Sequence, residues 1–329
     1  MAEETKRKYE AIEDIPGIGP ATAEKLKELG FHTVESLATA TIRELVPAGI
    51  GEKQAGKIIS EARNSIALTF IRADELMKMR ENVLRLTTSS KPIDELLGGG
   101  IETQTITEFY GEYGVGKSIM CHQLAVDVQL PVERGGLNGG ALYIDTEQTF
   151  RPEWVVRMAE HLKLDPDKTA KNIIYCEAYN SDHQMLLLDK ADKVIKDNNI
   201  RLIVIDSLTA HFRSEYLGRE MLAERQQKLN SHMHRLVRLA RAFNAAAIVT
   251  NQVMAKPDQF FAMAVEAVGG HVVAHTSHTR VFIRRTASGP VRIARLVSSP
   301  YLAEGERIFK ITENGIEDIT EEDEVKRRR

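Results

Sequence analysis

Cysteine is scarce in this chain, whose 329 residues include only Cys121 and Cys176. Two isolated thiols disfavour a disulfide-stabilised secreted domain and a cysteine-ligated metal site. No apolar run is long enough to span a membrane, and no signal peptide opens the sequence. We therefore expect a protein of the reducing cytoplasm that has no membrane partner.

Neither sign of charge dominates, since 44 Lys and Arg stand against 47 Asp and Glu, for a net charge of −3. The protein is no polycation, so any binding of nucleic acid has to use local basic patches. The composition is that of a globular protein, and the length is sufficient for two domains and a sizeable core.

One run matches the phosphate-binding P-loop pattern G-x-x-x-x-G-K-[ST], namely Gly111-Glu112-Tyr113-Gly114-Val115-Gly116-Lys117-Ser118. Glycines allow the tight turn that aims several N–H groups at one point. Lys117 supplies a charge for the β- and γ-phosphates, and Ser118 offers a hydroxyl to Mg²⁺. Residues 105–109 predict a buried strand before the loop, and 119–126 predict a helix after it whose positive end favours anions. This context disfavours a chance match.

Strand and helix patterns alternate after the P-loop, which predicts an α/β core with a mostly parallel sheet. Further strands are expected at 141–145, 172–175, 201–206 and 245–251, with a hairpin of 280–284 and 291–297 about Ser288-Gly289-Pro290. The expected organisation is a tail (1–10), a small all-α domain (11–65), a linker (66–80), the ATPase core (81–320) and a charged tail (321–329).

Three polar residues follow predicted strands at the sheet edge where ligands of open α/β folds bind. Asp206 is expected to hold Mg²⁺ together with Ser118. Glu147 is expected to orient and deprotonate water against the γ-phosphate, in preference to capping the helix that begins near Arg151. Gln252 is expected to contact the γ-phosphate and respond to its loss.

Residues 11–65 contain an internal repeat, because 17–26 aligns with 49–58 at an offset of 32 residues. Each copy predicts a helix, a Gly-x-Gly turn and a second helix, as in the helix-hairpin-helix motif. Exposed N–H groups at such a turn suit DNA phosphates without sequence preference. The alternative is that the repeat is a protein-interaction module. For the second copy, whose turn carries acidic Glu52, this alternative has about the same weight as contact with DNA.

Two connections of the core are candidate DNA-binding segments. Residues 207–225 interleave basic residues with an aromatic, a pattern that suits a single-stranded backbone; they include Arg213, Tyr216, Arg219 and Arg225. A solvated helix face is the alternative for Arg225. Residues 253–277 predict a long loop, and such a loop in a compact domain is usually functional or mobile. In the linker, Phe70 either plugs the small domain onto the core or anchors in another subunit.

The chain resembles the archaeal RadA recombinases, which are relatives of RecA, over nearly its whole length. The matching segments are 96–104, the P-loop, 143–147, 149–153, 178–184, 223–227 and 250–253. The resemblance implies a RecA-like fold, binding of ATP and Mg²⁺, and ATP-dependent assembly of a filament on single-stranded DNA. It also implies homologous pairing with double-stranded DNA, followed by strand exchange.

The resemblance assigns further residues. Phe70 and Ala73 match the F-x-x-A polymerisation motif, and 207–225 and 253–277 match the two DNA-binding loops, the second including Gly269 and Gly270. His275 matches a histidine that links the second loop to ATP between subunits. Residues 297–305 match a cap over the neighbour's ATP, which gives contacts to Ser298, Pro300 and Ala303.

Several positions depart from the family pattern: Ile119, Gln148, Trp154, Glu220, His271, Ser298 and Ala303. Trp154 replaces a common Arg that covers adenine, so we expect the indole to stack on the base, with packing onto the sheet as the alternative. Two other functions compete with the recombinase: a ring helicase with the same core, and a non-catalytic mediator that binds ATP.

Overall fold

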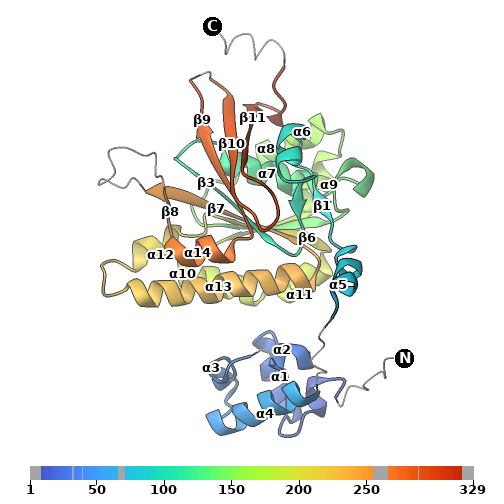
Figure 1. Ribbon diagram of the computed structural model, residues 1–329, viewed down its shortest axis with the longest axis vertical. Helices are drawn as coiled ribbons and strands as arrows, with labels where there is room; N and C mark the ends of the chain where they lie inside the picture. The colour runs from blue at the N-terminus through green and yellow to red at the C-terminus, as the bar shows by residue number, and fades with distance from the viewer. Residues whose placement is uncertain are drawn as a thin grey trace. The chain divides into compact units, whose positions relative to one another are not determined.

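In the computed structural model the described residues are 9–31, 33–38, 40–65, 71–254, 266–287 and 289–320. The chain folds as two compact units, 1–80 and 81–329 (Figure 1). In these ranges, the helices are all too short or too polar to cross a membrane.

The first unit is a small helical bundle. Helix α4 buries positions 55, 58, 59 and 62, the spacing of one helix face, against the other helices. Gly17, in the turn before α1, and Gly49, the C-cap of η2, have φ of +96° and +79°, values that favour glycine. The elements are η1 (Ile12–Asp14), α1 (Pro20–Glu28), α2 (Val34–Ala38), α3 (Ile42–Leu45), η2 (Val46–Ala48) and α4 (Glu52–Ser65).

The two Gly-x-Gly turns of the repeat lie side by side. Gln54 Nε2 donates a hydrogen bond of 2.9 Å to the carbonyl oxygen of Gly17. Lys25 Nζ lies 3.7 Å from the position that a Cβ on Gly49 would occupy. Both glycines are exposed, so the repeat presents two adjacent turns and a lysine on one surface.

The predicted linker contains a helix, α5 (Ala73–Arg80), that sequence analysis did not anticipate. Every residue of α5 is exposed, including Met77 at 72% and Met79 at 60%. Ala73 begins this helix. Phe70 lies outside the described residues.

The second unit is built on a ten-stranded sheet of order β12-β11-β10-β9-β3-β7-β6-β4-β5, with β8 paired to β7. Strands β9 to β5 of this order are parallel, and β10 to β12 extend it in antiparallel fashion. The bounds are β3 (Ile106–Gly111), β4 (Gly140–Asp145), β5 (Ile173–Glu177), β6 (Ile200–Asp206), β7 (Ala246–Met254), β8 (Glu266–Ala267), β9 (Thr279–Arg285), β10 (Val291–Ser298), β11 (Gly305–Thr312) and β12 (Gly315–Glu317). The α/β prediction is confirmed.

Helices cover both faces of this sheet (Figure 1). One core lies between the sheet and helices that include α7 and α8, and the other lies beneath α10 to α13. The bounds are α6 (Lys91–Leu96), α7 (Lys117–Asp127), η3 (Val132–Arg134), α8 (Pro152–His161), α9 (Pro166–Lys171), α10 (Ser181–Asp189), α11 (Ala191–Asp197), α12 (Ala210–Glu215), α13 (Leu222–Ala242) and α14 (Gly270–Thr276), with a small ribbon of β1 (Arg85–Leu86) and β2 (Ile101–Glu102). The expected long loop 253–277 is therefore partly wrong, since it includes β8 and α14.

A buried carboxyl ends the helix that follows the P-loop. Asp127 is fully buried, where Ser89 Oγ lies 2.9 Å and Gln123 Nε2 lies 2.8 Å from its oxygens. Gln123 also accepts a hydrogen bond from the Ile316 N–H, which ties α7 to β12. Burial raises the pKa of Asp127 to about 8.

This carboxyl makes stability depend on pH. An unfolded Asp ionises near pH ~4, whereas folded Asp127 keeps its proton up to about pH 8, so the folded state binds more protons between these values. The free energy of unfolding should fall as pH rises through this window. Asp127→Asn removes the titration, and at about pH 8 it should raise the melting temperature by at least about 2 °C, the shift for ~1 kcal/mol in a unit of this size.

Thermal melts at about pH 5 and about pH 8 test this prediction. Exposed Asp197→Asn is the control and should follow the wild type at both pH values. An equal pH dependence in Asp127→Asn and the wild type would contradict it.

Candidate active site

The carboxyl ends of four parallel strands lie level at one edge of the sheet. Gly111 of β3 pairs with Gln252 of β7, and Asp145 of β4 pairs with Asp206 of β6. A hollow of about 220 Å³ opens at this edge. Its lining is Tyr113, Gly114, Gly116, Lys117, Ser118, Ile119, Glu147, Thr149, Asp206, Ser207, Thr250 and Gln252.

The P-loop glycines are required by their backbone and surroundings. Gly114 and Gly116 have φ of +72° and +106°, and a Cβ on Gly116 would lie 2.1 Å from Ile311 Cδ1. Lys117 Nζ donates to the carbonyl oxygens of Gly111 at 3.0 Å and Glu112 at 2.8 Å, so its charge lies across the loop. Burial lowers the pKa of Lys117, while Asp206 and Glu147 oppose this effect. This cradle of N–H groups and one cation fits a phosphate chain.

The predicted metal ligands face the same hollow. Asp206 is 4% exposed; its carboxylate accepts from Thr250 Oγ1 and, at 2.8 Å, from the Tyr143 hydroxyl. Ser207 Oγ is buried and has no hydrogen-bond partner in the described part of the chain. One carboxylate and free hydroxyls suit Mg²⁺, which retains several waters and needs few protein ligands. The described residues contain no cluster of three or more His, Cys, Asp or Glu that could cage a metal.

Glu147 is held at the mouth of the hollow. Its N–H donates to Asp145 Oδ1 at 3.0 Å, and its Oε1 accepts from Gln252 Nε2 at 3.2 Å. Burial raises the pKa of Glu147, and the charge of Asp206 adds to the rise. Helix α8 begins at Pro152 with Arg151 as its N-cap. Glu147 thus contacts residues of the hollow, and the N-cap of α8 is Arg151.

A hydrogen-bonded chain joins this carboxylate to the first predicted DNA-binding segment. Gln252, which donates to Glu147, accepts from Arg213 Nη1 at 3.2 Å. Arg213 is exposed on α12, directly after β6. The three side chains therefore connect the surface of α12 to the interior of the hollow.

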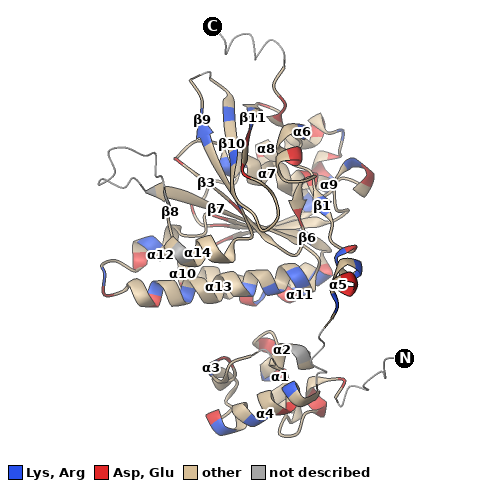
Figure 2. Cartoon of the chain, viewed as in Figure 1, with Lys and Arg blue, Asp and Glu red and all other residues tan. Residues whose placement is uncertain are grey.

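The remaining candidates for DNA contact differ in exposure. Arg219 is exposed in the turn before α13, and Arg225 is half-buried in the first turn of that helix. Figure 2 shows further basic residues along α13. The Tyr216 ring is 7% exposed and packs with Phe212, and its contact with DNA stays a prediction.

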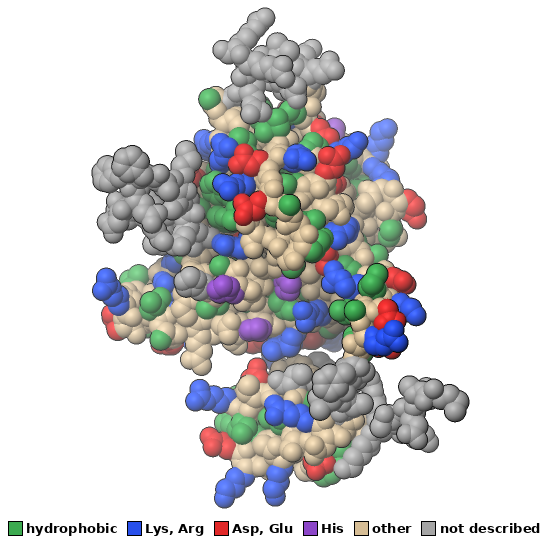
Figure 3. Space-filling model, viewed as in Figure 1, with side chains coloured by type: hydrophobic (Ala, Val, Ile, Leu, Met, Phe, Trp, Pro, Cys, Tyr) green, Lys and Arg blue, Asp and Glu red, His purple; other side chains and the backbone are tan. Residues whose placement is uncertain are grey.

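The described part of the second segment forms the start of α14. Gly269, at φ +101°, is its buried N-cap, and Gly270 is exposed. His275 is exposed in the last turn, and histidine side chains gather over α13 and α14 (Figure 3). Residues 255–265 lie outside the described residues.

The predicted cap residues lie away from the hollow of their own chain. Ser298 pairs with Arg280, which pairs with Glu108, three residues before the end of β3. Beyond Ser298, Tyr301 accepts from Arg85 Nη2 at 2.7 Å and donates to the buried Glu102 at 2.8 Å, on the strand before β3. Exposed Pro300 and Ala303 flank this tyrosine, and neither lines the hollow. Within one chain, the cap and the P-loop therefore occupy opposite ends of β3.

Trp154 is half-buried against the core beneath α8, with Arg157 6.0 Å from its ring centroid. It does not line the hollow. In the structure the Trp154 ring packs against the core, and its stacking on adenine stays a prediction.

Sequence analysis missed several polar residues around the hollow. Each lies within a few positions of a predicted site residue, and several of them bond residues distant in sequence, such as Tyr143 to Asp206 and His122 to Arg151. These residues are His122, Tyr143, Asp145, Thr149, Ser207 and Thr250.

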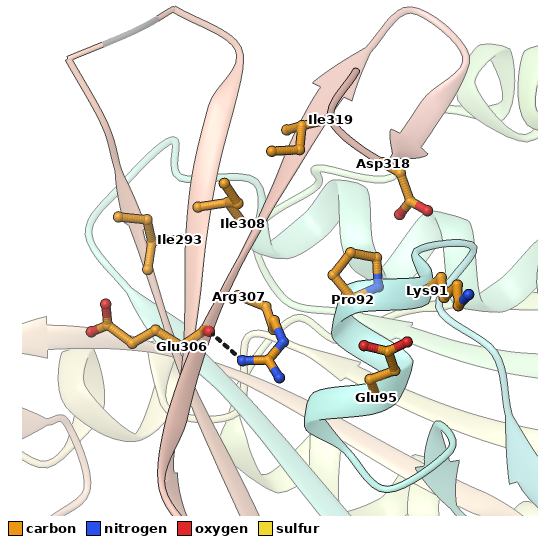
Figure 4. A pocket seen from close by; sticks show the side chains of 9 residues that line it. All are labelled: Lys91, Pro92, Glu95, Ile293, Glu306, Arg307, Ile308, Asp318 and Ile319. Atoms are coloured by element: carbon orange, nitrogen blue, oxygen red, sulfur yellow. Dashed lines mark hydrogen bonds between the residues drawn. The ribbon is translucent and has the colours of Figure 1, made fainter. Parts of the chain in front are cut away.

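A larger groove of about 620 Å³ lies elsewhere, between α6, β10 and β11 (Figure 4). Its walls mix apolar Pro92 and Ile308 with charged Lys91, Glu95 and Arg307. None of the predicted site residues lines it, so we assign the chemistry to the smaller hollow.

Comparison with known proteins agrees with this geometry. The Rad51 family model matches residues 79–319, which include every residue of the hollow. The chain belongs to the Rad51 family. A SAM-like helix-hairpin-helix tandem model matches residues 9–64.

Two relatives of this Rad51-family chain carry the description "DNA repair and recombination protein RadA". The Aeropyrum pernix protein is 51% identical over 316 residues, 96% of this chain and 99% of its own length. The Ignicoccus hospitalis protein is 51% identical over 323 residues, 97% of this chain and 98% of its own length. The resemblance to archaeal RadA recombinases is confirmed.

Proposed function

We propose that this chain is a DNA-dependent ATPase that assembles on single-stranded DNA and catalyses homologous pairing and strand exchange in recombination and repair. Its family membership and its two RadA relatives support this function. The observation that carries it is the chain Arg213–Gln252–Glu147, which joins a basic surface segment to a carboxylate beside the P-loop. Such a link gives DNA a direct route to the hydrolytic residue.

The predicted site residues that line the hollow each have a role in this proposal. The P-loop N–H groups and Lys117 bind the β- and γ-phosphates of ATP. Ser118 and Asp206 hold Mg²⁺, which neutralises charge on the transferred phosphoryl group. Glu147 orients a water molecule and accepts its proton, and its raised pKa makes it a better base than an exposed carboxylate. Gln252 keeps Glu147 in place.

Glu147→Gln tests the base. The amide keeps the size and the contact with Gln252 but cannot take a proton, so the ATP turnover number should fall about 10²–10⁴-fold with ATP binding retained. Lys117→Ala, in contrast, should lose ATP binding, because it removes the cation that the P-loop motif itself places for the β- and γ-phosphates. Turnover with and without single-stranded DNA is the measurement. Unchanged turnover in Glu147→Gln would exclude it as the base, and no turnover in the wild type would favour the mediator.

Arg213→Ala tests the link to DNA. It should weaken single-stranded DNA binding equally for all sequences and lower the salt slope by about 0.7. Stimulation of ATP turnover by DNA should fall more than turnover without DNA, since the contact to Gln252 is also lost. Arg307→Ala, in the groove of Figure 4, is the control. An Arg213→Ala protein with wild-type DNA affinity and stimulation would remove the first segment from the DNA path.

Self-association through Phe70 and Ala73 is part of the proposal. Edge strand β5 pairs only with β4 in the described sheet, and exposed apolar side chains lie on it and on the following residues: Tyr175 (41%), Tyr179 (70%) and Leu186 (52%). This surface suits an apolar anchor from a second copy. Head-to-tail assembly also brings the cap (Ser298, Pro300 and Ala303) to the hollow of a neighbour, which one chain alone cannot do.

Phe70→Ala should abolish assembly and leave the fold intact. Truncation of such an anchor costs about 2 kcal/mol or more, roughly 30-fold in the dissociation constant. Light scattering and a thermal melt of one sample measure both properties. Exposed Val132→Ala, on η3, should behave as the wild type. Preserved assembly with a lower melting temperature would instead place Phe70 between the domains of one chain.

The two adjacent Gly-x-Gly turns, with Lys25 beside them, support DNA binding without sequence preference by the first unit. We propose the cytoplasm as the location. A strand-exchange assay separates the proposal from the ring helicase, which unwinds a forked duplex.

A further inference from the structure

His122 is a buried histidine that the reaction proposed above does not use. It lies on α7 one turn after Ser118 and is 2% exposed. Its Nε2 accepts a hydrogen bond of 2.9 Å from the backbone N–H of Arg151, and its Nδ1 lies 2.5 Å from the Ser118 carbonyl oxygen. Because a backbone N–H can only donate, Nε2 carries no proton, and Nδ1 is the nitrogen that donates to Ser118.

The two partners of this ring belong to different parts of the site. Ser118 lies in the first turn of α7, beside the phosphate cradle. Arg151 ends the short segment that begins at Glu147, and it is the N-cap of α8. A single imidazole therefore sets the separation between the P-loop helix and the segment of the proposed base.

Aromatic packing fixes the plane of the ring. The His122 and Phe150 rings stack with centroids 4.8 Å apart and planes 16° apart. On another side, Tyr143 lies 5.5 Å away, and its hydroxyl donates to Asp206. The imidazole cannot turn without disturbing Phe150 and the tyrosine that holds the metal-binding carboxylate.

A second side chain, Asp145, anchors the backbone N–H groups of the segment from Glu147 to Arg151. Asp145 accepts from the N–H of Glu147 at 3.0 Å and from the N–H of Phe150 at 2.9 Å, which fixes the segment to β4. His122 fixes its far end to α7. Loss of the ring nitrogens would remove the hydrogen bond by which α7 holds the Arg151 end of this segment.

We propose that His122 is a positioning residue for ATP hydrolysis, which holds the Glu147 segment against the P-loop helix so that the carboxylate meets water in line with the γ-phosphate. This inference rests on the proposed function of Glu147. A displacement of ~1 Å can cost about 10²-fold in rate. Phosphate binding by the P-loop needs no such alignment, so catalysis should be affected and nucleotide binding should not.

Two substitutions separate the hydrogen bonds from packing. His122→Phe keeps an aromatic ring for Phe150 but loses both nitrogens. His122→Gln keeps an acceptor that can reach the N–H of Arg151. Leu124→Met, on the same helix, is the control for core disturbance, since it conserves volume and Leu124 has no polar group.

Steady-state ATP turnover of the full chain on single-stranded DNA is measured together with the dissociation constants of ADP and of ADP–aluminium fluoride. In His122→Phe, kcat should fall about 10- to 100-fold. KM for ATP and the ADP affinity should stay within about threefold, while affinity for ADP–aluminium fluoride, which needs aligned water, should fall with kcat. His122→Gln should recover most of the kcat, and Leu124→Met should match the wild type.

A double substitution tests whether the effect passes through Glu147. In a Glu147→Gln background, His122→Phe should cause no further loss of kcat. Two results would overturn the inference and leave Glu147 as the base. In one, the losses of kcat from His122→Phe and Glu147→Gln multiply in the double variant. In the other, His122→Phe lowers ADP affinity and melting temperature enough to account for its lower kcat. A wild type without ATP turnover, or a Glu147→Gln protein equal to it, would overturn the proposed function and this inference with it.

Discussion

The parallel register of β3, β7, β6 and β4 is the constraint on which the site depends. These strands are apolar and buried on both faces, which parallel sheets require. The predicted site residues lie at or just beyond their carboxyl ends, and the register brings those ends level. A slip of one residue would turn Asp206 to the other face of the sheet. The packing of the core and the geometry of the hollow are thus set by the same pairing.

Burial of charge at this edge is tolerated because each group has partners. Asp206 is almost fully buried yet accepts from Tyr143 and Thr250. Removal of such partners leaves a desolvated carboxylate, which is costlier than the bond itself. These hydrogen bonds therefore allow a charged group to lie at the edge of the apolar core.

The sequence was sufficient to predict the P-loop, the ends of β4 and β6 and the α/β architecture, because these signals are local. Contacts between distant residues were not predictable: Arg151 to His122 spans 29 positions and Tyr143 to Asp206 spans 63. The burial of Tyr216 was not predictable for a related reason. A basic and aromatic pattern describes composition, but packing decides which side of α12 faces the core, and Phe212 and Tyr216 lie on that side. Helix α14 was missed because its short, glycine-led run has little helical propensity.

The opposite placement of the P-loop and the cap segment gives each chain two unlike ends. One end carries the cap segment, which is fixed by the hydrogen bonds among Arg85, Glu102 and Tyr301, and the other end carries the hollow. Copies joined head to tail by such ends have a direction and no built-in limit on number. A row of n chains would contain n − 1 completed junctions, with one hollow left uncapped at a terminus. Hydrolysis per chain would then be lowest in short rows and approach a plateau in long ones.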